Sequence, residues 1–358
     1  MSKKPVHMYC GGRRMPRLST VSGMWPDSSL FIGLEIEAEN LRYSNRSRTS
    51  DDDYNTLAEG GWCVDNDGSL RDDGREFKFA GPLCGMDITT ALDAFFNVVS
   101  FTPCHRAGIH IHVDWTTVDD ADSLATLMAI AYGLEPALFS IAGEGRKESS
   151  FCRPLQDIDP EKLAGAVRSG SFEWMHNNLL PGIGRYYGVN LASIAKHGTV
   201  EFRHFPSLCD RQKIETWIKL VMLFRIAATN PSLTPVKVCE MMSTPAGIHE
   251  FCRAYFGFHD LHTLLLDNMD IGAVAQRMKL MHGLIRVRPV AKATVTRSHA
   301  DKLSVSARRF IDKKYPQLRQ QRARAAELVK ELVNPNVHEF QRFQEDIMAR
   351  VTSGVETI

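Results

Sequence analysis

The sequence has no pair of cysteines spaced as Cys-x-x-Cys, although it contains eight cysteines among its 358 residues. A zinc ribbon requires such pairs, so the sequence argues against this class of site. No apolar run approaches the roughly 18 to 20 residues that span a bilayer, and the basic start MSKKPVHMYCGGRRMPRL is followed by no apolar stretch like that of a secretory signal. We therefore expect a cytoplasmic protein with reduced cysteines and no membrane partner.

Glycine-rich phosphate-binding loops are also missing, because neither GxxxxGK[ST] nor GxGxxG occurs in the sequence. If a nucleotide binds, the side chains of a sheet and their bound metals must hold it, rather than a glycine-rich helix start. Internal repeats and low-complexity tracts are absent as well, which argues against a repeat architecture.

The net charge is only +1, but it is distributed unevenly. Residues 275–330 contain 15 Lys and Arg residues against three acidic residues, so the remainder of the chain is acidic on balance. Such a stretch is typical of a solvated helical face that docks on the acidic part of its own chain. It is also typical of a surface that binds an acidic macromolecule such as nucleic acid.

Hydrophobic patterns predict alternating strands and helices in the first two-thirds of the chain. Strands are expected in 29–41, in a hairpin formed by 61–70 and 74–83, in 108–115, and as two strands joined around AKHG within 184–205. Helices are expected in 86–101, 119–143 and 210–230, with a polar loop at 42–55. The hairpins argue against a purely parallel sheet and favour an α+β fold, with an antiparallel sheet and helices packed on one face.

This pattern also predicts the domain organisation. We expect an extended N-terminal arm at 1–28, a catalytic domain at 29–235, and a mostly helical, basic C-terminal region at 236–358.

Four of the expected strands carry ionisable residues two positions apart. The pairs are Glu35 with Glu37, Glu76 with Lys78, His110 with His112, and Glu201 with Arg203. Because residues i and i+2 of a strand point to the same side, each pair shares a face. Clustered carboxylates repel one another, and a hard cation such as Mg²⁺ relieves this repulsion. Arginine binds phosphate through two parallel donors. Together these carboxylates, imidazoles and arginine suit a site for phosphoryl transfer.

Each of four motifs alone has an ordinary explanation. The ExE pair can lie on an exposed edge, the HxH pair can be structural or mark a zinc or iron site, TVEFR can form a cross-strand salt bridge, and DGSL is an ordinary turn. The four motifs together, each bounded by glycine and apolar residues, favour one shared site.

In this order the motifs resemble the amidoligase family, a branch of the glutamine synthetase-like carboxylate–amine ligases. The resemblance covers about residues 30 to 228, and the matching pieces within this range are FIGLEIEAE, WCVDNDGSL with GREFKFAGPL, RAGIHIHVDW, GRKESSFCRPL and YYGVNLASIAKHGTVEFRHF. The resemblance implies a curved antiparallel sheet of the glutamine synthetase-like catalytic type. It also implies an ATP- and Mg²⁺-dependent enzyme that converts a carboxylate into an acyl phosphate, which an amine then attacks.

The resemblance assigns roles to individual residues. It implies metal binding by Glu35, Glu37, Glu76 and Glu201. It implies catalytic roles for His110 and His112 near the phosphates or a metal, and for Glu201 and Arg203, where Arg203 steadies the transferred phosphoryl group. The set expected at the cofactor comprises Arg146, Asn190, Lys196 and Asp67, with Arg146 and Asn190 contacting substrate. Lys78 and Phe79 depart from the family pattern beside Glu76.

The expected substrates are a small-molecule or peptide carboxylate and an amine. Three other functions are compatible with the same residues: a phosphotransferase resembling a guanidino kinase, a metal hydrolase that uses His110 and His112, and a non-enzymatic binding or structural protein that retains the fold.

Overall fold

The computed structural model describes residues 24–43, 50–71, 74–118, 121–143, 145–169 and 185–286. Most of the expected N-terminal arm, and the basic stretch from residue 287 onward, lie outside the described residues. The elements in chain order are β1 (Ile32–Ala38), β2 (Leu41–Tyr43), α1 (Ser50–Glu59), β3 (Trp62–Asp65), β4 (Arg75–Phe79), α2 (Met86–Val98), β5 (Val99–Phe101), β6 (Cys104–Asp114), α3 (Ala121–Ala142), η1 (Leu155–Asp157), α4 (Pro160–Ser169), β7 (Val189–Asn190), α6 (Ala192–His197), β8 (Thr199–Ser207), α7 (Arg211–Ala228), α8 (Pro235–Met241), α9 (Pro245–Phe256), η3 (Phe258–Asp260), α10 (Leu261–Leu266) and α11 (Ile271–Arg286).

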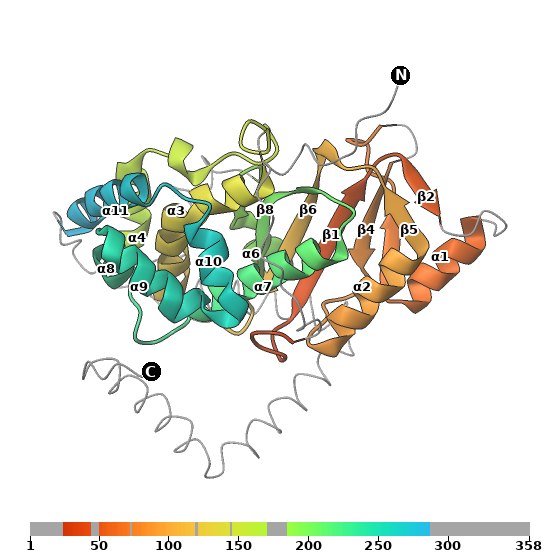
Figure 1. The fold of residues 1–358 in the computed structure, drawn as a ribbon, viewed down its shortest axis with the longest axis horizontal. Coiled ribbons are helices and arrows are strands. Elements are labelled where there is room, and N and C mark those ends of the chain that lie inside the picture. Colours follow the sequence, from red (N-terminus) through yellow and green to blue (C-terminus); the bar gives the residue numbers. More distant parts are fainter. Residues whose placement is uncertain are drawn as a thin grey trace, which may run out of the picture. The chain divides into compact units, whose positions relative to one another are not determined.

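A six-stranded antiparallel sheet in the order β3-β4-β1-β6-β8-β7 organises these elements (Figure 1). The register places Glu37 of β1 opposite Glu76 of β4, and His112 of β6 opposite Glu201 of β8. Four segments that are far apart in the sequence are thereby brought side by side. The α+β class with an antiparallel sheet, expected from the hairpin patterns, is confirmed.

One face of the sheet is apolar and forms the core. Its side chains have no exposed surface and include Ile36, Phe77, Ile111 and Phe202. Phe95 of α2 packs edge-on against Phe77 with 5.1 Å between ring centroids, and Phe224 of α7 lies 5.3 Å from Phe202. Helices α2 and α7 therefore cover this face, and the aromatic contacts stabilise it beyond simple burial.

Local sequence signals set the starts of the helices that follow the sheet. Asp210 caps α7 by accepting a hydrogen bond from the Lys213 amide, and Thr234 and Thr244 cap α8 and α9 in the same way. Pro235 and Pro245 occupy the first turns of α8 and α9, where a missing N–H costs nothing.

Helix α3 is long and apolar enough to cross a membrane by length and composition, which corrects the expectation that no apolar run approaches this size. In the structure, 83% of its most apolar window is buried inside the protein. It packs against α7, α8 and β8. This burial is typical of a central core helix.

Helices α8 to α11 pack against one another and against α3 and α4. Residues 235–286 therefore lie in the same compact unit as the sheet. The domain division at residue 235 stays a prediction.

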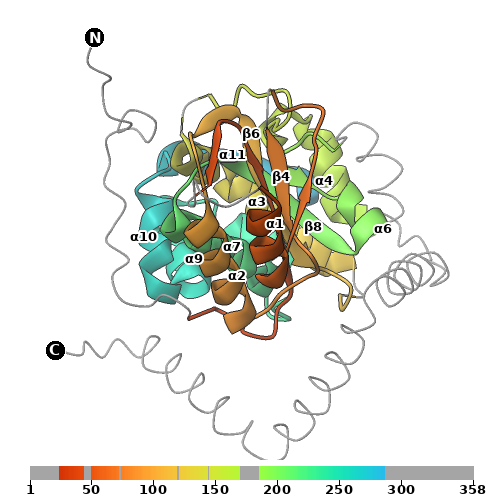
Figure 2. The same ribbon diagram turned by 90° about the vertical axis from the view of Figure 1, so that its right-hand side faces the viewer.

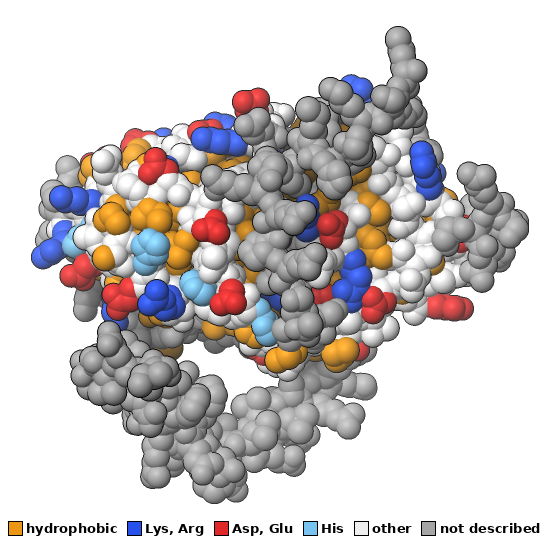
Figure 3. Space-filling view, in the orientation of Figure 1, with side chains coloured by type: hydrophobic (Ala, Val, Ile, Leu, Met, Phe, Trp, Pro, Cys, Tyr) orange, Lys and Arg blue, Asp and Glu red, His pale blue; other side chains and the backbone are white. Residues whose placement is uncertain are grey.

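On the face drawn in Figure 3, acidic and basic side chains are interspersed with scattered hydrophobic ones.

Two segments differ from the sequence-based expectation. Residues 192–197, expected as the end of one strand and the start of the AKHG joint, form the short helix α6, which ends at Gly198 in the left-handed conformation (φ 71°). The segment 42–55, expected to be a polar loop, includes β2 and the start of α1. Helix α1 was missed because few of its side chains are apolar, although Leu57 is completely buried. Helix α6 lies on the opposite side of the sheet from α1, α2 and α7 (Figure 2).

Candidate active site

The second face of the sheet carries the four ionisable pairs. Glu35 lies opposite His110 across β1 and β6, and it lies opposite Lys78 across β1 and β4. The alternation of β-strand side chains puts all these groups on the side away from the apolar core. The structure therefore brings together the paired residues that the sequence singles out.

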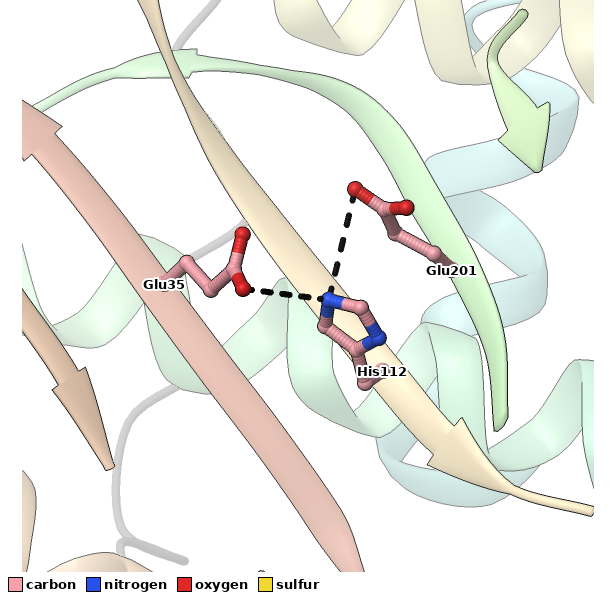
Figure 4. Close-up of side chains that lie close together, drawn as sticks. All are labelled: Glu35, His112 and Glu201. Atoms are coloured by element: carbon pink, nitrogen blue, oxygen red, sulfur yellow. Dashed lines mark ion pairs between the residues drawn. The ribbon is translucent and has the colours of Figure 1, made fainter. Parts of the chain in front are cut away.

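A first group of possible metal ligands comprises Glu35, His112 and Glu201, each offering an atom within 4.8 Å of the others. Figure 4 shows His112 on β6 between the two carboxylates of β1 and β8. Its Nε2 lies 3.5 Å from Glu35 Oε1 and 4.0 Å from Glu201 Oε1. This nitrogen is buried and has no hydrogen-bond partner within the described part of the chain. The arrangement leaves one nitrogen and two carboxylates aimed at a common point.

Two hydroxyl groups orient His112. Thr199 Oγ1 lies 2.9 Å from His112 Nδ1, and Ser193 Oγ lies 3.3 Å from the same atom. Contacts of this kind fix the ring orientation and direct the other nitrogen toward a ligand. Sequence reasoning missed both residues, because Ser193 belongs to the unexpected helix α6 and Thr199 was considered only as part of the TVEFR strand.

A second group of possible ligands comprises Glu37, Asp67 and Glu76, whose oxygen atoms also lie within 4.8 Å of one another. Asp67 comes from the turn after β3, where its Oδ1 accepts a hydrogen bond from the Ser69 amide (2.8 Å). Glu37 Oε2 accepts a hydrogen bond from the Gly108 amide (2.7 Å), which fixes this carboxylate against β6. Asp67 was expected at the cofactor, and the structure places it among carboxylates.

His110 connects the two groups. Its Nδ1 donates to Glu35 Oε2 (3.1 Å) and lies 3.6 Å from Glu201 Oε1, while its Nε2 lies 3.8 Å from Glu37 Oε1. The ring is almost completely buried. It therefore holds carboxylates of both groups in fixed relative positions.

Lys78 supplies a positive charge at the edge of the second group. Its Nζ lies 2.7 Å from both Glu76 Oε2 and Asp65 Oδ2. Burial alone would lower the pKa of Lys78, but these two carboxylates raise it above its ordinary value. Lys78 therefore stays protonated and partly offsets the negative charge of Glu76.

The site perturbs several pKa values in opposite directions. Burial raises the pKa of Glu76, and the neighbouring Glu35 and Glu37 charges add to the shift. Burial would also raise the pKa of Glu35, but the adjacent His110 and His112 hold it far below its usual range. Burial would lower the pKa of His112, yet the adjacent Glu35 and Glu201 carboxylates raise it. Such divergent shifts are typical of functional sites.

Glu201 is held from two sides. Asn190 Nδ2 donates to Glu201 Oε2 (2.5 Å), and Arg203 Nη1 donates to Glu201 Oε1. Arg203 Nε also donates to the carbonyl oxygen of Phe151 (3.3 Å). Asn190 thus orients Glu201, while the Arg203 guanidinium is positioned beside the first group of ligands.

Arg146 lies on the polar face over Gly108 and is almost completely buried. Its Nη2 donates to the carbonyl oxygen of Arg203 (2.7 Å), at a point where the β6–β8 register is interrupted by an irregularity. In this structure Arg146 therefore positions the Arg203 backbone. Its expected contact with substrate stays a prediction.

Lys196 is exposed in the last turn of α6. The structure does not place it within either ligand group, so its expected role at the cofactor also stays a prediction.

The donor set suits divalent cations. The second group is made only of carboxylates, the ligands that Mg²⁺ prefers, and the first combines carboxylates with an otherwise unbonded imidazole nitrogen. Metal binding by Glu35, Glu37, Glu76 and Glu201 thus fits the residues present.

A family model with the description "Putative amidoligase enzyme" matches residues 87–224. The match extends from α2 to most of α7 and includes β6 and β8, whereas β1 and β4 precede it. No curated protein matches the sequence significantly.

Proposed function

We propose that the chain belongs to the amidoligase family, on the match over residues 87–224, and that it is an ATP-dependent carboxylate–amine ligase. One observation carries the proposal: two groups of metal ligands lie on one sheet face, and Arg203 lies beside them. Phosphoryl transfer needs positioned charges more than covalent chemistry from the protein, which is what this face offers. We further propose that the sheet is of the glutamine synthetase-like catalytic type.

In the first proposed step, a carboxylate oxygen of the acid attacks the γ-phosphorus of ATP. The bond from that phosphorus to the bridging oxygen breaks, and ADP leaves with the bonding electrons. In the second step the amine nitrogen attacks the acyl carbon, the carbon–oxygen bond to phosphate breaks, and the amine loses a proton. The products are an amide, ADP and phosphate.

Bound Mg²⁺ would neutralise phosphate charge and orient the phosphate chain. One group of ligands for Mg²⁺ would be Glu35, His112 and Glu201, and the other would be Glu37, Asp67 and Glu76. The other residues act directly. Arg203 donates to the transferred phosphoryl group, where negative charge accumulates in the transition state. His110 keeps the carboxylates in position through its contacts with Glu35, Glu37 and Glu201.

A second candidate function is metal-dependent hydrolysis. Glu35, His112 and Glu201 form a mixed nitrogen and oxygen set that zinc or iron also accepts. The all-carboxylate second group favours magnesium instead, and for this reason we place the ligase first. Metal analysis showing stoichiometric zinc or iron in the purified protein would favour the hydrolase.

The test of the proposed function is ATP turnover, measured as ADP release, with pooled carboxylic acids and pooled amines. We expect turnover only when an acid and Mg²⁺ are present, and amide formation only when an amine is added. Phosphorylated substrate as the final product, without amide, would instead show a phosphotransferase.

A further inference from the structure

Two aromatic side chains beside the candidate active site are exposed. Phe151 is 45% exposed and Tyr186 is 36% exposed, and their rings pack edge-to-face with 5.6 Å between centroids. Single exposed apolar side chains are common on protein surfaces. Two aromatic rings that contact each other next to a polar site instead resemble the apolar wall of a ligand pocket.

The backbone around these rings is fixed by hydrogen bonds. The Arg153 amide donates to the Tyr186 carbonyl (2.7 Å), and the Gly188 amide donates to the Arg153 carbonyl (2.8 Å). The Cys152 amide donates to the Ser149 carbonyl (3.1 Å). Both rings therefore stand on anchored segments, and a ligand would not need to order them on binding.

Arg185 adds a positive charge to the aromatic pair. Its guanidinium lies over the Tyr186 ring, 4.8 Å from the centroid, and its Nη2 donates to the Tyr186 hydroxyl (2.7 Å). The contact with Tyr186 raises the pKa of Arg185, and the carboxylates of Glu201 and Asp67 contribute to this rise. The exposed guanidinium is thus within electrostatic reach of both ligand groups.

The aromatic pair is also connected directly to Arg203, because the Phe151 carbonyl accepts a hydrogen bond from Arg203 Nε (3.3 Å). In the proposed reaction, Arg203 contacts the phosphoryl group during its transfer to the acid. The attacking acid must touch the γ-phosphorus, whereas the base of ATP is separated from it by the ribose and two further phosphates. The acid therefore lies nearer to Phe151 than the base of ATP does.

We propose that Phe151, Tyr186 and Arg185 form the subsite for the acid substrate. This acid carries an apolar or aromatic portion that packs on the two rings, and a second anionic group that Arg185 binds through its paired donors. The inference rests on the proposed ligase function and deepens it by defining the class of acid.

Three probe acids distinguish the contribution of the aromatic portion from that of the second anionic group. Phenylsuccinate has a ring and two carboxylates, succinate lacks the ring, and 3-phenylpropanoate lacks the second carboxylate. Their binding to the full-length protein, with Mg²⁺ and a non-hydrolysable ATP analogue, can be titrated by ligand-observed NMR. We expect phenylsuccinate to bind about tenfold or more tightly than either of the others, as expected for burial of a ring or for one charge-assisted hydrogen bond.

Substitutions assign each preference to a residue. Phe151→Ala should remove the advantage of phenylsuccinate over succinate, and Arg185→Gln should remove its advantage over 3-phenylpropanoate. Met86→Ala on α2, where the side chain is 61% exposed, and Arg253→Gln on α9 are matched controls that should bind like the wild type.

Equal affinity for the three probes, or variants that bind like the wild type, would overturn the subsite. A lower affinity of Phe151→Ala for the ATP analogue alone would also overturn it, because that result would place the base of ATP against the ring. Binding is measured without turnover, so the two proposals fail separately. Probe discrimination without ADP release from any acid and amine would refute the ligase but support the subsite, whereas ADP release with three equal affinities would refute only the subsite.

Discussion

The guanidinium of Arg146 lies so close to Gly108 that a Cβ added there would stand 2.4 Å from Arg146 Nη2 and 2.9 Å from His110 Nε2. A larger side chain at Gly108, which precedes the two histidines of β6, would therefore clash with Arg146 and His110. The glycine allows Arg146 to reach the Arg203 carbonyl across the irregularity between β6 and β8.

This contact predicts the effect of Gly108→Ala. The added methyl group must displace Arg146 or His110, so we expect turnover to fall by at least tenfold, with a loss of stability of about 1 to 3 kcal/mol as for other overpacked sites. Urea denaturation and ATP turnover measure the two effects. The control is Gly283→Ala in α11, where nothing lies within 4 Å of the added atom and helix propensity favours alanine. Wild-type turnover in Gly108→Ala would contradict the spatial argument.

Arg203 is expected to act on the transition state. Arg203→Lys keeps the charge but loses the paired donors, so it should rescue activity poorly. We expect Arg203→Lys and Arg203→Ala to fold, to bind ATP with Mg²⁺ within about tenfold of the wild type, and to lose a factor of roughly 10³ to 10⁵ in turnover. Thermal unfolding and ATP turnover should be measured on the same preparations. A sharply lowered melting temperature, or near-normal turnover, would instead indicate that Arg203 serves only as the ion-pair partner of Glu201.

The two ligand groups predict separable metal sites. Glu35→Gln and Glu201→Gln should weaken Mn²⁺ binding to one site, and Glu37→Gln should weaken binding to the other, because each substitution removes one charged ligand. Calorimetric titration with Mn²⁺ counts the sites and their affinities. The exposed Glu59→Gln is the control. A wild-type protein that binds no divalent cation would refute both assignments.

His197 predicts a pH dependence of stability. Its ring packs edge-to-face on His112, with 5.9 Å between centroids. Burial, followed by the charges of His112 and Lys196, lowers the pKa of His197 from 6.5 to about 4. Between these values the unfolded chain binds a proton at this residue that the folded chain does not bind, so stability falls as the pH falls.

The free energy of unfolding, measured by urea denaturation from pH 7 to pH 4, checks this expectation. His197→Asn should have a shallower slope than the wild type over this window, whereas the exposed His249→Asn should keep the wild-type slope. Identical slopes for His197→Asn and the wild type would show that His197 does not contribute.

Period-two patterns made most of the sheet predictable. The alternation of Glu35 and Glu37 with buried Leu34 and Ile36 fixes both the strand and the face of each side chain. The amidoligase resemblance, supported by the match over residues 87–224, was read from motifs on these same strands. The division of the metal ligands into two groups could not be predicted in this way, because it depends on the register between strands that are distant in sequence.

Other parts of the site had no comparable signal. Ser193 orients His112 only because residues 192–197 turn into a helix that ends at Gly198, whereas the local pattern favours strands. Phe151 and Tyr186 are 35 residues apart, and each is an ordinary aromatic residue in the sequence. Their contact arises from backbone hydrogen bonds between Arg153 and the Tyr186–Gly188 segment, which no periodicity encodes.

The most direct test of the central claim follows one oxygen atom. With an acid labelled with ¹⁸O in its carboxylate, formation of an acyl phosphate and its capture by an amine transfer one labelled oxygen to inorganic phosphate. We predict one ¹⁸O atom in each phosphate released, detected by the isotope shift in the ³¹P NMR spectrum, together with the amide in equal amount. Unlabelled phosphate released while ATP is consumed would contradict the ligase mechanism, because the phosphoryl group would then have passed to water and not to the acid.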